Sequence, residues 1–182
     1  CPALNPGKYG NAITFDGIND EINTSFNGFP SNMTSITVEF WGYPAKNLST
    51  SVLTAFIDDG ANRFNIHFPW ADNNIYWDFG NIGSGGRLYT NFNNSWFNNW
   101  AYWTFTSQYG TGMNIYRNGI LLASSATASS LLLNSTRTLA FASYTSASVP
   151  YWNGTIDEFR IWNRSLGSNE IQEHYMSNLQ KF

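Results

Sequence analysis

Residues 154–166 read Gly-Thr-Ile-Asp-Glu-Phe-Arg-Ile-Trp-Asn-Arg-Ser-Leu, an apolar strand with two adjacent carboxylates that runs into a short helical tail. A counterpart near the start of the chain, residues 15–22, reads Phe-Asp-Gly-Ile-Asn-Asp-Glu-Ile. We expect these two strands to lie side by side and to close the fold. The best candidate for a metal site lies between them.

The composition suits one domain with a sizeable core, spanning residues 1–182. Hydrophobic residues make up 42% of the chain and aromatic residues 18%, whereas charged residues make up only 12%. A disordered chain has the opposite composition. The net charge is -3 and Lys and Arg form no cluster, which argues against nucleic acid as a partner. No apolar run approaches the ~20 residues of a transmembrane segment, so none is expected.

Short strands separated by Gly and Asn turns follow one another along the chain. Residues 35–43 and 63–68 alternate apolar and polar side chains, as half-buried strands do. Asn118-Gly119 between two apolar stretches predicts a hairpin. Residues 1–10 read as an irregular lead-in, and residues 168–175 as one short helix with Ser168 as its N-cap. The pattern predicts an all-β, antiparallel sandwich or barrel.

Five motifs, in order, resemble those of laminin-G-like (concanavalin A-like) jelly-roll domains. They are GNAITFDGINDEI at 10–22, SITVEFW at 35–41, NWAYWTF at 99–105, MNIYRNG at 113–119, and the stretch at 154–166. The resemblance covers about residues 8–176. It implies an antiparallel two-sheet jelly-roll sandwich whose first and last strands pair, with one short C-terminal helix. It also implies a divalent cation near that pairing, and a role as a carbohydrate- or protein-binding module of a secreted or surface protein.

The expected cation is a structural Ca²⁺, which takes six to eight oxygen ligands. Asp16, Asp20 and Asp157 match the family pattern, and the carbonyl of Gly17 is a possible further ligand. If the first and last strands pair, Asp157 comes within reach of the other two. The alternative is that Asp16 caps a turn, while Asp157 or Glu158 pairs with a nearby arginine.

Several aromatic residues lie in loop-like stretches rather than in alternating strands, and we take them as candidate ligand-binding residues: Trp70, Trp96, Tyr144, Tyr151 and Trp152. Aromatic faces stack on the apolar faces of sugar rings, and neighbouring Asn and Asp bond the hydroxyls. The alternative is that these side chains fold back as lids on the core. Five other tryptophans are predicted to pack on strands: Trp41, Trp77, Trp100, Trp103 and Trp162.

Catalysis is not expected. A glycoside hydrolase needs two carboxylates that flank one glycosidic bond. Asp157 and Glu158 are adjacent, so a regular strand points them to opposite faces. His67 and His174 are far apart in the sequence and show no metal-ligand spacing.

Seven Asn-x-Ser/Thr sequons suggest an extracellular or cell-surface protein, although a chain rich in Asn, Ser and Thr forms sequons by chance. The glycosylation candidates in loop-like stretches are Asn32, Asn47, Asn93 and Asn134. The chain begins at Cys1 and is expected to be part of a larger surface protein or assembly.

These features predict a non-catalytic, extracellular, lectin-like module that binds a glycan or a surface glycoprotein. The alternative is a structural or adhesive surface domain that binds protein or packs in an assembly. A hydrolase is the weakest of the three hypotheses.

Overall fold

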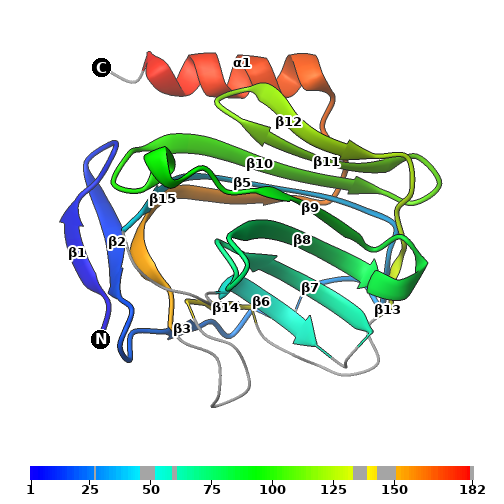
Figure 1. The fold of residues 1–182 in the computed structure, drawn as a ribbon, viewed down its shortest axis with the longest axis horizontal. Coiled ribbons are helices and arrows are strands. Elements are labelled where there is room, and N and C mark those ends of the chain that lie inside the picture. The colour runs from blue at the N-terminus through cyan, green and yellow to red at the C-terminus, as the bar shows by residue number, and fades with distance from the viewer. Residues whose placement is uncertain (27, 46–51, 59–60, 133–138, 143–150, 181–182) are drawn as a thin grey trace.

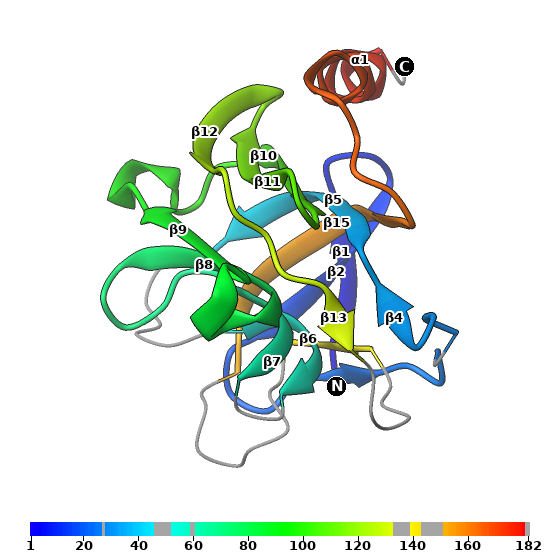
Figure 2. The same ribbon diagram turned by 90° about the vertical axis from the view of Figure 1, so that its right-hand side faces the viewer.

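The computed structural model describes residues 1–26, 28–45, 52–58, 61–132, 139–142 and 151–180, with the backbone alone for 52–58 (Figure 1). Its described strands form two antiparallel sheets that lie face to face, beside a small third pair (Figures 1 and 2). The two-sheet jelly-roll sandwich predicted from the sequence is confirmed.

Sheet A has the strand order β1 (Ala3–Pro6), β2 (Asn11–Asp16), β15 (Asn153–Trp162), β5 (Ser35–Pro44), β10 (Ala101–Gln108), β11 (Gly112–Arg117), β12 (Ile120–Ser125). Sheet B has the order β3 (Ile22–Asn23), β14 (Ala140–Phe141), β6 (Val52–Asp58), β7 (Asn62–His67), β8 (Asn74–Asn81), β9 (Arg87–Asn91). The remaining elements are the pair β13 (Leu131–Leu132) and β4 (Asn32–Met33), the 3₁₀ turns Ile82–Ser84 and Asn94–Trp96, and the helix α1 (Ser168–Leu179).

The predicted pairing of the first and last strands is confirmed. β15 lies between β2 and β5, with Thr155 opposite Thr14 and Ile156 opposite Ile13. The two threonine hydroxyls are 3.0 Å apart and share a hydrogen bond. The last long strand is therefore an inner strand of sheet A, held by ladders on both sides.

The core lies between the sheets, because apolar residues alternate along most long strands. In β5, Ile36, Val38 and Phe40 are fully buried between the sheets. Trp103 of β10 and Trp77 of β8 belong to the same cluster. Each such side chain contributes about 1.5–3 kcal/mol when it leaves water, so the aromatic content of the chain supplies the packing energy.

Helix α1 covers the outer face of sheet A, away from sheet B (Figures 1 and 2). Ile171 of the helix is fully buried against Tyr116 and Leu166. The buried carboxylate of Glu39 accepts a 2.7 Å hydrogen bond from Nε1 of Trp162 and lies 3.0 Å from Nδ1 of His174. This network fixes the helix on the sheet. Among the described residues, no helix has the length and apolar character needed to span a bilayer.

Two local predictions are wrong. The lead-in expected to be irregular contains β1, which pairs with β2 from Ala3 opposite Thr14 to Pro6 opposite Asn11. The N-cap of α1 is Gly167 rather than Ser168, because Glu170 reaches back and accepts the Gly167 backbone N–H at 3.0 Å.

The alternation assumed for Asp157 and Glu158 also fails. Asp157 lies opposite Trp41, but the next paired residue of β15 is Arg160, opposite Glu39, so β15 carries one extra residue in a bulge. Glu158 has a left-handed backbone, with φ of 52°, and its carboxylate pairs with Arg160. A left-handed backbone at a non-glycine residue costs about 1–2 kcal/mol, and here it turns the strand.

Candidate functional site

The structure does not bring the predicted calcium ligands together. Asp16 and Asp20 share one turn, in which Oδ2 of Asp20 accepts the Asp16 N–H at 3.0 Å and Oδ1 of Asp16 accepts the Ile18 N–H at 2.8 Å. Asp16 lies opposite Asn153, so Asp157 is four residues further along β15, about 13 Å away.

Asp157 is occupied elsewhere in the fold. Its Oδ2 accepts the backbone N–H of Tyr9 at 2.8 Å. Gly17, the fourth predicted ligand, has a φ of 74° and serves the Asp16 turn. Within the described part of the chain, no three His, Cys, Asp or Glu side chains are placed to hold a metal ion. The residues therefore do not fit the shared site that was expected of them. The alternative holds, with Asp16 capping a turn and Glu158 paired with Arg160.

Most of the predicted ligand-binding aromatics are also placed elsewhere. Trp152 is a core residue, 1% exposed, and its Nε1 donates to the carbonyl of Phe68 at 2.8 Å. Trp96 is half-buried, and the guanidinium of Arg117 lies 4.9 Å from its ring centroid. Tyr151 is half-buried just before β15. Tyr144 lies outside the described residues. Trp70 lines a pocket.

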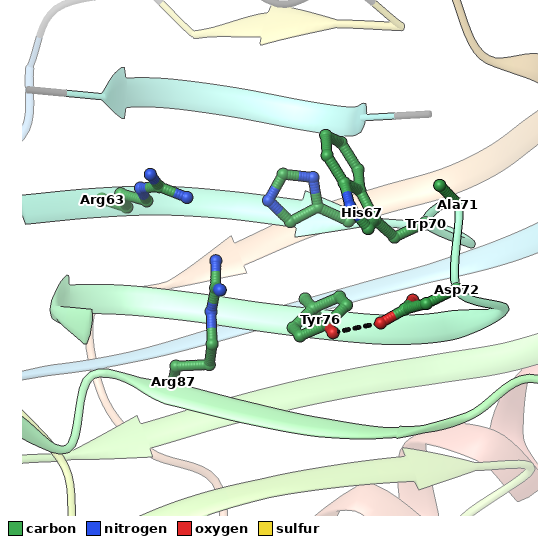
Figure 3. Close-up of a pocket in the computed structure, with 7 residues that line it drawn as sticks. All are labelled: Arg63, His67, Trp70, Ala71, Asp72, Tyr76 and Arg87. Atoms are coloured by element: carbon green, nitrogen blue, oxygen red, sulfur yellow. Dashed lines mark hydrogen bonds between the residues drawn. The ribbon is translucent and has the colours of Figure 1, made fainter. Parts of the chain in front are cut away.

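That pocket lies on the outer face of sheet B and has a volume of about 320 Å³ (Figure 3). Its lining residues come from β7, β8, β9 and the loop between β7 and β8, and are Arg63, His67, Trp70, Ala71, Asp72, Tyr76 and Arg87. Alternation puts Phe64 and Ile66 of β7 in the core, and Arg63 and His67 on the outer face. The pocket thus combines aromatic surface with both hydrogen-bond donors and hydrogen-bond acceptors.

A tight turn positions Trp70 beside the sheet. The Asn73 N–H donates to the Trp70 carbonyl at 2.9 Å, and the Trp70 N–H donates to the Asn74 carbonyl at 2.7 Å. Asn73 adopts a left-handed backbone, which asparagine tolerates well. The Trp70 ring then lies edge-on to His67, with 4.5 Å between ring centroids. Trp70 is half-buried, so part of its side chain is open to the pocket.

The floor beneath the pocket is the buried carboxylate of Asp78, which is not exposed at all. Arg87 binds it with two hydrogen bonds, Nε to Oδ1 at 2.6 Å and Nη2 to Oδ2 at 2.5 Å. Nη1 of Arg63 is 3.8 Å and Nε2 of His67 is 3.5 Å from Oδ2. Burial alone would raise the pKa of Asp78, but the hydrogen bonds and charges of Arg87 and His67 outweigh it and lower the pKa. The carboxylate therefore stays ionised and holds both arginines beside the pocket.

This lowered pKa predicts a loss of stability in acid. A carboxyl whose pKa is lower in the folded state stabilises the fold above its unfolded pKa, about 3.9, and loses that contribution as the pH falls through the folded value. We therefore expect the stability difference between wild type and Asp78→Asn to be largest at pH 5–7 and to shrink below pH ~4. Urea unfolding at a series of pH values measures it, and a constant difference down to pH ~2.5 would contradict it.

Asp72 and Tyr76 form the opposite wall of the pocket. The Tyr76 hydroxyl donates to Oδ2 of Asp72 at 2.5 Å, and the Asn74 N–H donates to Oδ1 at 3.1 Å (Figure 3). Burial is the largest single effect and acts to raise the pKa of Asp72, but the hydrogen bonds from Tyr76 and Asn74 together outweigh it and lower the pKa. Burial and the bond to Asp72 raise the pKa of Tyr76, so its hydroxyl remains a donor. Asp72 is exposed and ionised, and can accept hydrogen bonds from a ligand.

A second hollow, of about 360 Å³, lies where β2 and β15 approach β3 and β14. Most of its walls are apolar side chains, which include Ile13, Phe15, Ile22, Phe141 and Phe159. Asp157 and Glu158 border it, but the first accepts the Tyr9 N–H and the second pairs with Arg160. Compared with this hollow, the pocket on sheet B offers the hydroxyl groups of a ligand far more hydrogen-bond partners.

Sequence reasoning missed five of the functional side chains of this pocket: Arg63, His67, Asp72, Tyr76 and Arg87. A signal was present, because the polar positions of 63–68 include Arg63 and His67 in a chain with only 12% charged residues and two histidines. The cross-strand register that groups them, His67 opposite Tyr76 and Asp78 opposite Arg87, is a property of the folded sheet.

Two of the four candidate glycosylation sites can be placed. Asn32 and Asn93 are both exposed. Oδ1 of Asn93 accepts the Ser95 N–H at 2.9 Å in a tight turn. Asn47 and Asn134 lie outside the described residues. Exposure meets one requirement for modification.

Several solved structures of domains from larger proteins share this fold. Domain 4 of AbnA, a GH43 extracellular arabinanase from Geobacillus stearothermophilus solved with arabinotriose, matches with a TM-score of 0.75 and 18% identity over 95% of this chain and 80% of that one. The binding domain of Botulinum Neurotoxin DC, solved with SialylT, matches with a TM-score of 0.75 and 19% identity over 98% of this chain. The binding domain of Paraclostridial Mosquitocidal Protein 1 matches with a TM-score of 0.75 and 17% identity over 97% of this chain.

This chain spans less than half of the two toxin domains, 44% and 45% of their lengths. At these identities the likeness shows a shared fold. No curated protein sequence matches the chain. The sequence pattern of the concanavalin A-like lectin/glucanases superfamily matches residues 16–172, which is most of the chain and includes the pocket and β15. The chain therefore belongs to the concanavalin A-like lectin/glucanases superfamily.

Proposed function

We propose that this domain is a non-catalytic carbohydrate-binding module of a secreted or surface protein, and that it binds glycan in the pocket on sheet B. The observation that carries the proposal is the composition of that pocket. A half-exposed Trp70 lies beside acceptors and donors for sugar hydroxyls, namely Asp72, Arg63 and Arg87. Sugar rings present apolar faces and polar edges, so such a site suits them.

The electrostatics of the pocket favour binding over catalysis. A glycosidase needs a carboxylic acid with a raised pKa to protonate the leaving group. The two carboxylates at this pocket, Asp72 and Asp78, both have lowered pKa values, and Asp78 is buried beneath Arg87. They are therefore suited to accept hydrogen bonds and to hold cations.

The solved relatives give independent support. One is a domain of an extracellular arabinanase in complex with arabinotriose, and another is a toxin binding domain in complex with SialylT. A non-catalytic role on an exported protein agrees with both descriptions. Calcium has no part in the proposal, because Asp157 lies apart from Asp16 and Asp20.

One observation favours the alternative, an adhesive domain that binds protein. β12 ends sheet A among the described strands, and its residues Ile120 and Leu121 are 70% and 51% exposed. Exposed apolar edge strands pair with other chains. Concentration-dependent self-association that Ile120→Lys abolishes would favour this alternative.

Replacing Trp70 with alanine tests the proposal. The ring stacks on sugar in the pocket, so we expect glycan affinity to fall at least about tenfold. The fold should persist, because the side chain is half-exposed in a loop. The measurement is a glycan array to find ligands, followed by titration calorimetry with arabinotriose and trisaccharides of glucose and xylose.

Tyr109→Ala is the matched control, because Tyr109 is 59% exposed in the turn after β10, on the other sheet. Its glycan affinity should equal that of wild type. Unchanged binding in Trp70→Ala, or no glycan bound by the wild-type domain, would contradict the proposal.

A further inference from the structure

A line of rings crosses sheet B beyond the pocket. The register places His67 opposite Tyr76, and Tyr76 opposite Tyr89 of β9. The ring centroids are 6.0 Å apart in the first pair and 5.5 Å apart in the second. Trp70 extends the line on the β7 side, 4.5 Å from His67. The line therefore runs perpendicular to the strands, from Trp70 to Tyr89.

The two ends of this line are its open aromatic surfaces. Tyr89 is 58% exposed, and Trp70 is half-exposed. In the middle, the guanidinium of Arg87 lies 4.7 Å from the centroid of Tyr76 and covers that ring. Stacking surface is thus available at both ends, and hydrogen-bonding groups occupy the centre.

Polar residues border the line on both sides. On one side, Asp78 of β8 lies opposite Arg87 of β9 on the outer face of the sheet. On the other side, Asn74 lies opposite Asn91. Asp72, which binds the Tyr76 hydroxyl, adds an acceptor on the second side. Neighbouring strands are about 4.8 Å apart, so β7 and β9 are separated by about 10 Å. Trp70 lies beyond β7, so the two stacking ends are at least this far apart, which leaves room for a sugar between two others that stack at the ends.

We propose that the site is a track for three consecutive units of a linear glycan, with Tyr89 as a further subsite outside the pocket. The inference rests on the proposed carbohydrate-binding function. One terminal sugar stacks on Trp70 and the other on Tyr89. The central sugar bonds to Arg87 on one side and to Asp72 on the other. The ligand class is accordingly an internal stretch of a linear chain, and a single sugar fills only part of the site.

Titration calorimetry with a length series tests this inference. The probes are mono-, di-, tri- and tetrasaccharides of α-1,5-linked arabinose, and the same lengths of β-1,4-linked xylose and glucose. For the series that binds, we expect affinity to rise at least about tenfold from one unit to three and to level off at four. Tyr89→Ala should weaken trisaccharide binding about tenfold and leave monosaccharide binding unchanged.

Tyr89→Phe is the conservative variant, because it keeps the ring, and it should bind as wild type does. Tyr109→Ala should also leave the whole length series unchanged. Equal affinities for one and three units, or an equal loss for both in Tyr89→Ala, would overturn the track while leaving the pocket as a binding site. Absence of binding to every series would overturn both the track and the proposed function.

Discussion

Replacing Asp78 with alanine is expected to lower the free energy of unfolding by about 3–5 kcal/mol. The carboxylate is fully buried and accepts two hydrogen bonds from Arg87. Removing it leaves a partly buried guanidinium without this counter-charge. It also removes the charge near Nε2 of His67. The penalty is large because a buried ion that loses its partner keeps its desolvation cost.

Urea unfolding at pH 7 measures the loss, and Asp72→Ala is its matched control. Asp72 belongs to the same pocket but is exposed, so its removal should cost about 1 kcal/mol or less. A loss below about 1 kcal/mol for Asp78→Ala would show that Arg87 is stabilised by other contacts. Glycan binding should weaken together with stability, because Asp78 holds the arginines in place.

The fold was largely predictable because it depends on local patterns. The apolar alternation of β5 and β7 specifies which side chains enter the core, and this holds wherever the strands lie. The motifs at the two ends of the chain identified the pairing of β2 with β15. Each of these signals is carried by residues that are neighbours in sequence.

The bulge in β15 shows where such reasoning fails. The regular alternation of Asp157 and Glu158 assumed one residue on β15 for each residue on β5. The left-handed backbone of Glu158 breaks that count. Nothing in the stretch Asp157-Glu158-Phe159 favours a left-handed residue, because Glu is not among the residues that adopt it readily. The bulge is set by the strands on both sides.

The candidate site was less predictable for a related reason. Its residues come from three strands and one loop, and only the register brings His67, Tyr76 and Arg87 together. The expected meeting of Asp157 with Asp16 and Asp20 failed in the same way. Pairing of the correct strands did not ensure that Asp16 and Asp157 met, because the register places Asn153 opposite Asp16. A family pattern specifies which strands pair better than it specifies which side chains meet.

The loop aromatics show most clearly the difference between what the local sequence indicates and what the folded structure determines. Trp70 and Trp152 looked alike in the sequence, as large aromatics outside alternating strands. The structure leaves Trp70 half-exposed in a pocket and buries Trp152 in the core. The two therefore differ in what their loss should do, and this difference is measurable.

Trp152→Ala is expected to destabilise the domain by about 3–5 kcal/mol. Its ring packs at 6.0 Å from Phe15 of β2 and 6.4 Å from Phe68, at the end of β7, so it joins the two sheets. Its Nε1 also satisfies the buried carbonyl of Phe68. Trp152→Phe keeps most of the volume but loses this hydrogen bond, and should cost about 1–3 kcal/mol. Trp70→Ala is the matched control and should change stability far less, while it removes the stacking surface that Trp70 offers to glycan. Denaturant unfolding of the three variants measures these differences in the free energy of unfolding. Equal losses of stability in Trp152→Ala and Trp70→Ala would show that both side chains are lids on the core. Trp70 would then no longer be the aromatic platform of the site.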